Sequence, residues 1–223
     1  MPRIAVVLSG CGVHDGAEIH ESVITLLALD RAGAEVVVAA PDMDQAHVVN
    51  HLTGDEAPGE TRNVAVESAR IARGAVIDLA RLDCATIDAV IFPGGFGAAK
   101  NLCSYAFDGP ELTIHPEVER VTLEMVRAAR PIGTMCIAPV MTAKILADNG
   151  FNVTVTIGND EATAGHIESF GATHRVCAVD EIVLDANTRV VSTPAYMLAG
   201  SIKEAAAGIE KLVAAVLQLC VRK

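Results

Sequence analysis

One cysteine stands at a position typical of a catalytic nucleophile. Cys136 follows a short apolar run at 132–135 and precedes a helix-like stretch that extends to about residue 148. A thiol at the amino end of a helix experiences the helix dipole and unpaired N–H groups, which lower its pKa. We therefore expect Cys136 to be a thiolate on a strand-to-helix turn, a nucleophile elbow. The alternative, which we favour for the other cysteines, is a buried core thiol.

A glycine-rich stretch at 93–97 offers the hydrogen-bond donors that such a nucleophile needs. It reads PGGFG and follows a predicted strand at 88–92. Attack on a carbonyl carbon generates an oxyanion, and backbone N–H groups can be aimed at that oxygen. We expect the amides of Gly95 and Ile137 to form this oxyanion site. Glycine pairs also mark simple turns, so the stretch indicates an oxyanion site only in combination with Cys136.

An acidic residue in the first predicted helix, 18–31, is the candidate proton carrier. A charged carboxylate beside Cys136 would raise the pKa of the thiol, so Glu21 assists only if it is protonated or shares a proton with the sulfur. In that form Glu21 would hydrogen-bond the thiolate and later move protons in the substrate. Glu21, like Glu18, also fits an acid that complements the helix dipole in the first turn.

No histidine adjoins Cys136 in the sequence, so no thiol–imidazole pair can be assigned. Spacing does not rank the seven histidines of the chain. For two of them, His20 and His51, we favour a structural role over a catalytic one. The further candidate substrate-site residues are Cys11, His20, His51, Lys100 and Thr193.

Composition argues against several classes of function. The chain has 223 residues, of which 51% are apolar, and a formal net charge of −11 with no run of basic residues. We therefore expect no nucleic-acid partner and no membrane association. The six cysteines form no Cys-x-x-Cys pair, so we expect no metal site. Without a signal-peptide pattern, we expect a cytoplasmic protein with one domain over residues 1–223.

Short apolar runs alternate with helical segments along the chain. A strand, helix, strand opening favours a parallel sheet with right-handed crossovers, and ligands collect at the carboxyl ends of such strands. We expect a surface excursion at 41–59. We expect strands at 3–8, 35–40, 88–92, 132–135, 153–157, 176–178, 181–185 and 189–193, and helices at 18–31, 61–73, between Pro116 and Pro131, up to about 148, and after a capping box at Ser201 and Glu204.

Several motifs are spread over almost the whole chain. They are SGCG at 9–12, DGAEIHE at 15–21, NHLTG at 50–54, ETRNV at 60–64, ARIARG at 69–74, PGGFGAAKNL at 93–102, MCIAP at 135–139 and TPAYM at 193–197. Together they resemble the ThiJ/PfpI superfamily, and within it the glyoxalase-like ElbB group, named for enhanced lycopene biosynthesis. The resemblance implies an α/β fold: a flavodoxin-like three-layer α/β/α sandwich with a mostly parallel sheet, shared with class I glutamine amidotransferases.

The resemblance also implies roles for individual residues. Cys136 corresponds to the elbow nucleophile, Glu21 to its paired acid, and Gly95 with Ile137 to the oxyanion site. The protease-like members have a histidine directly after the cysteine, where this chain has Ile137, so a peptidase is disfavoured. Glutaminases have His-Pro-Glu late in the fold, where this chain has Thr193-Pro194-Ala195, which weakens a glutaminase role.

Three functional hypotheses follow. The first is a cofactor-independent glyoxalase that converts glyoxal or a similar small dicarbonyl to a hydroxy acid through the Cys136 thiolate. The second is a redox or electrophile sensor that uses the same cysteine. The third is a glutaminase-like subunit that is silent until a partner binds. The resemblance further implies a homodimer and a connection to isoprenoid biosynthesis.

Overall fold

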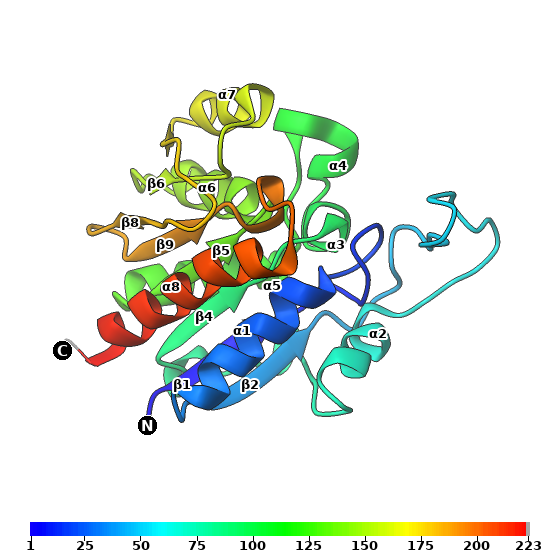
Figure 1. The fold of residues 1–223 in the computed structure, drawn as a ribbon, viewed down its shortest axis with the longest axis horizontal. Helices are drawn as coiled ribbons and strands as arrows, with labels where there is room; N and C mark the ends of the chain where they lie inside the picture. Colours follow the sequence, from blue (N-terminus) through cyan, green and yellow to red (C-terminus); the bar gives the residue numbers. More distant parts are fainter. Residues whose placement is uncertain (222–223) are drawn as a thin grey trace.

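The computed structural model describes residues 1–221 as a central sheet with helices on both faces (Figure 1). The strands are β1 (Arg3–Val7), β2 (Glu35–Ala40), β3 (Ile77–Asp78), β4 (Ala89–Phe92), β5 (Ile132–Met135), β6 (Thr154–Val155), β7 (Thr173–His174), β8 (Val183–Asp185) and β9 (Val190–Thr193). The helices are α1 (Ile19–Arg31), α2 (Val64–Ile71), α3 (Phe96–Lys100), α4 (Tyr105–Asp108), α5 (Pro116–Arg127), α6 (Ala138–Asp148), α7 (Glu161–Ser169) and α8 (Ile202–Val221).

The main sheet has the strand order β3-β2-β1-β4-β5-β9-β8. Every neighbouring pair is parallel except β8 and β9, which are antiparallel. The chain moves outward from β1 to β2 and β3, then returns to the other side of β1 with β4 and β5. The sheet therefore reverses its order between β1 and β4, which is where ligands bind in open α/β sheets. The predicted flavodoxin-like α/β fold is confirmed.

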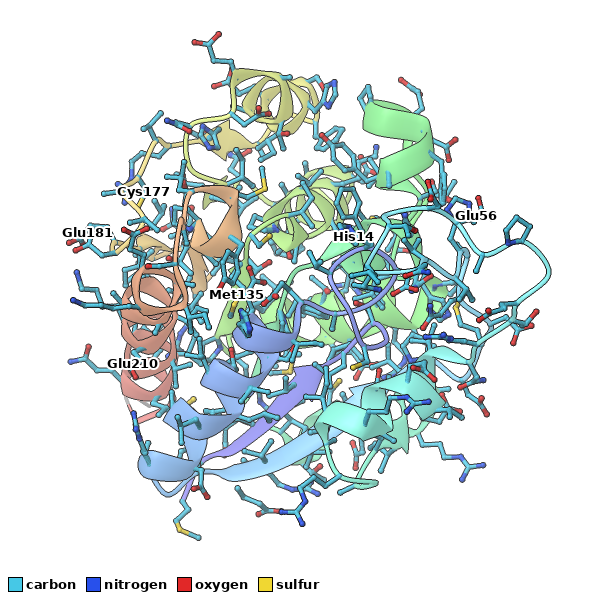
Figure 2. The ribbon with its side chains drawn as sticks, turned by 45° about the vertical axis from the view of Figure 1, so that its right-hand side comes forward. His14, Glu56, Met135, Cys177, Glu181 and Glu210 are labelled. Atoms are coloured by element: carbon cyan, nitrogen blue, oxygen red, sulfur yellow. The ribbon has the colours of Figure 1, made fainter. Side chains whose placement is uncertain are left out.

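Two apolar cores lie on opposite faces of the sheet. On one face α1 and α8 pack side by side over β1, β4, β5 and β9 (Figure 1). On the other face α5 and α6 cover the same strands. The strands are buried on both faces, which is why they appear in the sequence as continuous apolar runs. Met135, at the end of β5, lies in the interior, whereas Glu181 and Glu210 lie at the edge of the molecule (Figure 2).

Most predicted elements are present, with shifts of one to three residues at several ends, and β2 and β5 have the predicted bounds. The capping box of α8 is only half formed. Ser201 Oγ accepts the N–H of Glu204 at 3.3 Å, but the Glu204 carboxylate accepts the N–H of Gly200 rather than that of Ser201.

The predicted strand at 176–178 is wrong. Val176 is 69% exposed, and the strand that pairs with β6 is β7, at Thr173–His174. Three helices were missed. Of these, α3 and α4 are only four or five residues long, whereas α7 is preceded by Asp160, a capping aspartate whose side chain accepts the N–H of Thr163. That capping signal could have revealed α7.

The excursion between β2 and α2 runs away from the sheet edge, as predicted (Figure 1). Isolated bridges hold its two arms together, pairing Asp44 with Asn63 and Val49 with Glu56. Its inward side is anchored because Gln45, Val48 and Val49 are buried. The segment is therefore a folded loop that packs against the β1–α1 connection.

Candidate active site

A cavity of about 290 Å³ opens at the carboxyl ends of four adjacent parallel strands. The loops after β1, β4, β5 and β9 each contribute to its wall, and α4 closes one side. This is the edge at which the sheet reverses its order. The lining residues are Val13, Glu18, Gly95, Phe96, Ala99, Tyr105, Ala106, Cys136, Ile137, Tyr196 and Met197.

Cys136 lies at the bottom of this cavity on the turn between β5 and α6. Its backbone has a φ of +59°, a left-handed conformation that is unusual for a residue other than glycine. Its N–H donates to the carbonyl of Thr193 at 3.1 Å, and Ile137 caps the helix that follows. The residue is only 8% exposed. The strained turn directs the side chain into the cavity, which is the geometry of a nucleophile elbow.

Glu21 approaches the cysteine from α1. It is fully buried, and its two carboxyl oxygens accept the N–H of Gly94 at 2.8 Å and the N–H of Tyr196 at 3.2 Å. Burial, reinforced by the nearby Glu18, raises the pKa of Glu21 to about 7, although its hydrogen bonds to the two amides and to Cys136 oppose the shift. Glu21 therefore changes its charge near neutral pH.

The pKa of the Cys136 thiol is raised well above its ordinary value. The main cause is burial, and the second is the charge of Glu21, while hydrogen bonds from the amides of Gly95 and Ile137 act in the opposite direction. The prediction of a lowered thiol pKa, and of a thiolate at rest, is therefore wrong, although the amide of Ile137 at the start of α6 does act in the predicted direction. Two partial dipoles do not compensate for the removal of a thiolate from water beside a carboxylate.

Two glycines after β4 allow close backbone approaches, Gly94 toward Cys136 and Glu21 and Gly95 toward the β1–α1 loop. A Cβ on Gly94 would lie 2.5 Å from Cys136 Cβ and 3.0 Å from the Glu21 carboxylate. Gly95 has a φ of +91°, and a Cβ there would lie 2.4 Å from the backbone nitrogen of Glu18. The PGGFG stretch therefore allows the backbone to approach the sulfur closely, and the amides of Gly95 and Ile137 both point at Cys136.

Three other predicted residues lie around this centre without touching the sulfur. The hydroxyl of Thr193 donates to the carbonyl of Glu181 at 2.8 Å, so only the Thr193 backbone supports the site. Lys100 donates to the carbonyl of His14 at 2.9 Å and lies over the ring of Phe96, a wall residue. His20 hydrogen-bonds the hydroxyl of Tyr196 at 2.8 Å. Lys100 and His20 therefore lie behind the cavity wall.

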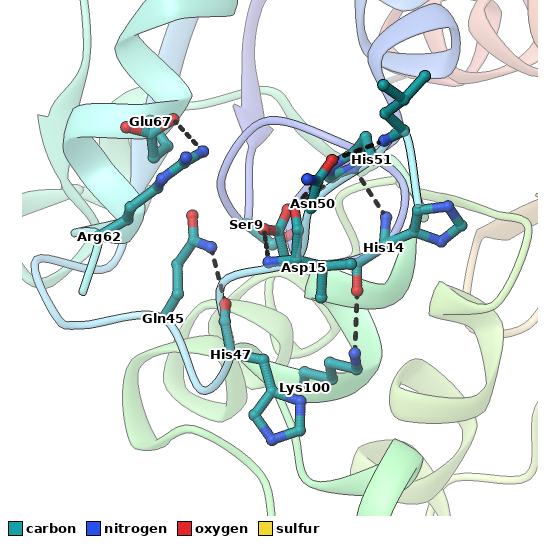
Figure 3. Close-up of polar contacts among 12 residues, drawn as sticks. Ser9, His14, Asp15, Gln45, His47, Asn50, His51, Arg62, Glu67 and Lys100 are labelled. Carbon is teal, nitrogen blue, oxygen red and sulfur yellow. Dashed lines mark hydrogen bonds and ion pairs between the residues drawn. The ribbon is translucent and has the colours of Figure 1, made fainter. Parts of the chain in front are cut away.

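The remaining two candidates, His51 and Cys11, are not among the lining residues. His51 Nε2 accepts the N–H of His14 at 3.2 Å, while Nδ1 lies 3.0 Å from the carbonyl of Val49 (Figure 3). A carbonyl only accepts hydrogen bonds, so Nδ1 carries the proton and the ring is satisfied. The thiol of Cys11 has a raised pKa, chiefly because of burial and then because of Glu67.

Sequence reasoning missed the two tyrosines of the cavity wall. Tyr196 and Tyr105 are the only tyrosines in the chain, and both line the cavity. Each hydroxyl is paired with a histidine, Tyr196 with His20 at 2.8 Å and Tyr105 with His166 at 2.9 Å. In a chain with 3% aromatic residues, this scarcity was the available signal.

Residues 1–221 contain neither a metal-binding cluster nor a membrane-spanning helix. No group of three or more histidine, cysteine, aspartate or glutamate side chains there is placed to hold a metal ion. No helix in the same range combines the length and the apolar character needed to cross a bilayer.

Among known proteins, no family model matches the chain. The human glutamine amidotransferase-like class 1 domain-containing protein 3, mitochondrial, is 48% identical over 226 residues, which cover 97% of this chain and 83% of that protein. The rat ES1 protein homolog, mitochondrial, is 46% identical with coverages of 97% and 84%. The zebrafish ES1 protein, mitochondrial, is 36% identical with coverages of 87% and 77%.

Solved structures give the same picture of the fold. An isoprenoid biosynthesis protein with an amidotransferase-like domain from Ehrlichia chaffeensis superposes with a TM-score of 0.91 at 37% identity, covering 98% of this chain and 99% of that one. Drosophila melanogaster DJ-1beta superposes with a TM-score of 0.55 at 18% identity, with coverages of 98% and 96%. The second likeness concerns the fold alone.

Proposed function

Because the chain belongs to the glutamine amidotransferase-like class 1 (ES1) family and has the fold of the DJ-1/ThiJ/PfpI superfamily, we propose that it is a cofactor-independent glyoxalase-type enzyme. Its substrate is a small dicarbonyl and its product a hydroxy acid. The observation that carries the proposal is the pair of Cys136 and Glu21 at the base of a cavity, with the amides of Gly95 and Ile137 aimed at the sulfur.

The first step is the addition of the thiol to an aldehyde carbon. Since the pKa of Cys136 is raised, the thiol keeps its proton at rest, and the ionised Glu21 accepts that proton as the sulfur–carbon bond forms. The aldehyde oxygen becomes an alkoxide that the amides of Gly95 and Ile137 stabilise. Glu21 then returns the proton to this oxygen, which completes a hemithioacetal.

The second step moves hydrogen between the two carbons of the substrate. Glu21 accepts the proton from the carbon bonded to sulfur and delivers it to the neighbouring carbonyl carbon. The hydroxyl proton of the first carbon passes to the oxygen of the second, so a thioester with an adjacent hydroxyl group results. One carbon is oxidised and the other reduced, so no external oxidant takes part. Water then hydrolyses the thioester, releasing the hydroxy acid and the Cys136 thiol.

The two alternative functions have less support. A sensor cysteine needs a thiolate that oxidants reach easily, whereas Cys136 is buried and has a raised pKa. A glutaminase triad needs a histidine beside the cysteine, and none of the residues that line the cavity within the described chain is a histidine. Both observations favour chemistry that begins with proton transfer to Glu21.

The test is glycolate formation from glyoxal. We expect wild-type protein to produce glycolate and Cys136→Ala to lose the activity by on the order of 10³-fold or more. The matched control is Cys11→Ala, because Cys11 lies outside the cavity wall, and its turnover should stay within about two-fold of wild type. Equal turnover by wild type and Cys136→Ala would reject the proposal.

The metabolic pathway in which this reaction takes place is also a proposal. The name of the Ehrlichia relative connects that protein with isoprenoid biosynthesis, and we extend the connection to this chain. The cytoplasmic location stays a prediction from the sequence, and the homodimer stays a prediction from the resemblance. The names of the relatives describe those proteins as mitochondrial.

A further inference from the structure

The cavity above Cys136 is too large for glyoxal alone. Its volume is about 290 Å³, whereas an apolar protein cavity of about 150 Å³ holds a benzene molecule. Glyoxal has only two carbons and two oxygens, so it would leave much of the cavity unfilled. The space that remains is roughly that of one six-membered ring.

The wall beyond the sulfur is apolar. Phe96 flanks the cavity and is 50% exposed, which is unusual for a large apolar side chain next to a buried centre. Tyr105 and Tyr196 line the cavity, and their hydroxyls are already paired with histidines. Met197 adds a side chain that adapts to the shape of a ligand. Such a wall gains free energy by covering an apolar group.

The charges around the cavity disfavour an anionic substituent. None of the lining residues in the described part of the chain is a lysine, an arginine or a histidine, and Glu18 lies in the wall. Lys100, the cation beside Phe96, already donates to the carbonyl of His14. A phosphate or carboxylate on the substrate would meet Glu18, and no lining residue could pair with its charge.

We propose that the substrates are uncharged 2-oxoaldehydes that carry an apolar substituent of about the size of a phenyl ring. This inference rests on the proposed glyoxalase function and specifies the substrate class of the same site. The aldehyde carbon meets Cys136, and the substituent lies against Phe96, Tyr105 and Met197. Contacts remote from the reacting carbons hold the aldehyde over the sulfur, so they raise turnover as well as affinity.

The first experiment compares substrates on the intact protein. We expect kcat/KM for phenylglyoxal, measured as mandelate formation, to exceed that for glyoxal by about ten-fold or more, with methylglyoxal between them. Equal or reversed preference, with glyoxal turnover that depends on Cys136, would overturn the substrate assignment and leave the proposed function standing. Absence of turnover with all three dicarbonyls would reject the proposed function.

A variant of the wall links the preference to the cavity. Ala106 lines the cavity from α4 and is exposed, so Ala106→Leu narrows the site without disturbing the core. We expect the ratio of kcat/KM values, phenylglyoxal over glyoxal, to fall at least about five-fold. The matched control is Ala214→Leu, at an exposed position on α8 outside this cavity, where the ratio should not change. An unchanged ratio in Ala106→Leu would contradict the assignment.

A binding measurement does not depend on turnover. Acetophenone resembles phenylglyoxal but lacks the aldehyde, so it should occupy the cavity and protect Cys136 from alkylation by iodoacetamide. We expect half-protection at a concentration at least about ten-fold lower than with acetone, and we expect Ala106→Leu to weaken the protection by acetophenone. If acetophenone gives no protection, or protects Ala106→Leu as well as wild type, the cavity does not select apolar substituents.

Discussion

Two buried acids lie close together in the sequence but have different roles: Asp15 in the β1–α1 connection and Glu21 on α1. Asp15 is 1% exposed, accepts the N–H of Val49 at 2.7 Å and lies 3.7 Å from His51 Nε2. Glu21 is fully buried and accepts two amides, but its carboxyl group also faces the thiol of Cys136. Asp15 joins a loop to the body of the protein, whereas Glu21 faces a reactive partner.

The difference lies in what surrounds each carboxyl group. The Asp15 carboxylate is surrounded by the amide of Val49 and the ring of His51, both of which belong to the excursion. The surroundings of Glu21 raise its pKa to about 7, chiefly because burial penalises its charge. An acid near its pKa at neutral pH can both take and give a proton. Burial alone therefore does not identify a catalytic acid, and the nature of its partner does.

The largest expected effect comes from adding a methyl group at Gly94, where the backbone after β4 approaches Cys136 and Glu21. Gly94→Ala places a Cβ 2.5 Å from Cys136 Cβ, so the sulfur or Glu21 must move. We expect glyoxal turnover to fall on the order of 10³-fold and stability to fall by about 1 to 3 kcal/mol. The control is Gly165→Ala on α7, where a Cβ meets nothing within 4 Å. That change should leave turnover intact and stabilise the protein slightly.

Replacement of Glu21 by glutamine should separate catalysis from thiol reactivity. Glu21→Gln removes the proton carrier, so we expect turnover to fall on the order of 10²-fold. It also removes the carboxylate that raises the pKa of Cys136, so alkylation of the thiol by iodoacetamide at pH 8 should become faster. The exposed Glu161→Gln serves as control. Slower alkylation in Glu21→Gln would contradict the role assigned to this charge.

The pH dependence of stability provides a second measure of Glu21. Its pKa is about 7 in the folded protein against an ordinary value of 4.5, so the folded state holds the proton more tightly. The corresponding stabilisation is complete below pH 4.5 and is lost as the pH rises through about 7. Between pH 5 and 8, wild type should lose about 2 kcal/mol more unfolding free energy than Glu21→Gln, as measured by urea titration. If the unfolding free energies of wild type and Glu21→Gln varied with pH in parallel, the raised pKa of Glu21 would be refuted.

The smallest effect concerns the other acid. Asp15→Ala leaves the N–H of Val49 without its acceptor, so we expect a loss of about 1 to 2 kcal/mol of unfolding free energy. Turnover should change by less than about three-fold, because Asp15 does not line the cavity. Asp44→Ala, at an exposed acid in the excursion to which Asp15 is bonded, is the control. A loss of turnover as large as that of Glu21→Gln would remove the distinction between the two acids.

The order of elements could be predicted because buried parallel strands leave continuous apolar runs. The stretches at 35–40 and 132–135 have the predicted bounds. The run at 176–178 has similar residues but no strand partner, which local sequence does not reveal. Tertiary pairing therefore overrides propensity in the irregular region between α7 and β8.

The centre of the site could also be predicted, although its electrostatics could not. Cys136, Glu21, Gly95 and Ile137 are brought together from three separate segments, with Cys136 and Ile137 on the same turn, as the resemblance implied. The direction of the thiol pKa was wrong because burial and a neighbouring carboxylate depend on the packed structure, whereas a helix terminus can be read locally. The tyrosine wall was missed because Tyr105 and Tyr196 are 91 positions apart, the difference between their sequence numbers.

Tyr196 contacts both the cavity and the titrating carboxyl group of Glu21. It lines the cavity, and its backbone N–H donates to Glu21. A molecule that displaces this residue changes the hydrogen bonding of the acid, and titration of the acid changes the fit of the residue in return. Occupancy and proton uptake are therefore reciprocal quantities in this protein, so the heat of ligand binding should vary with the ionisation enthalpy of the buffer.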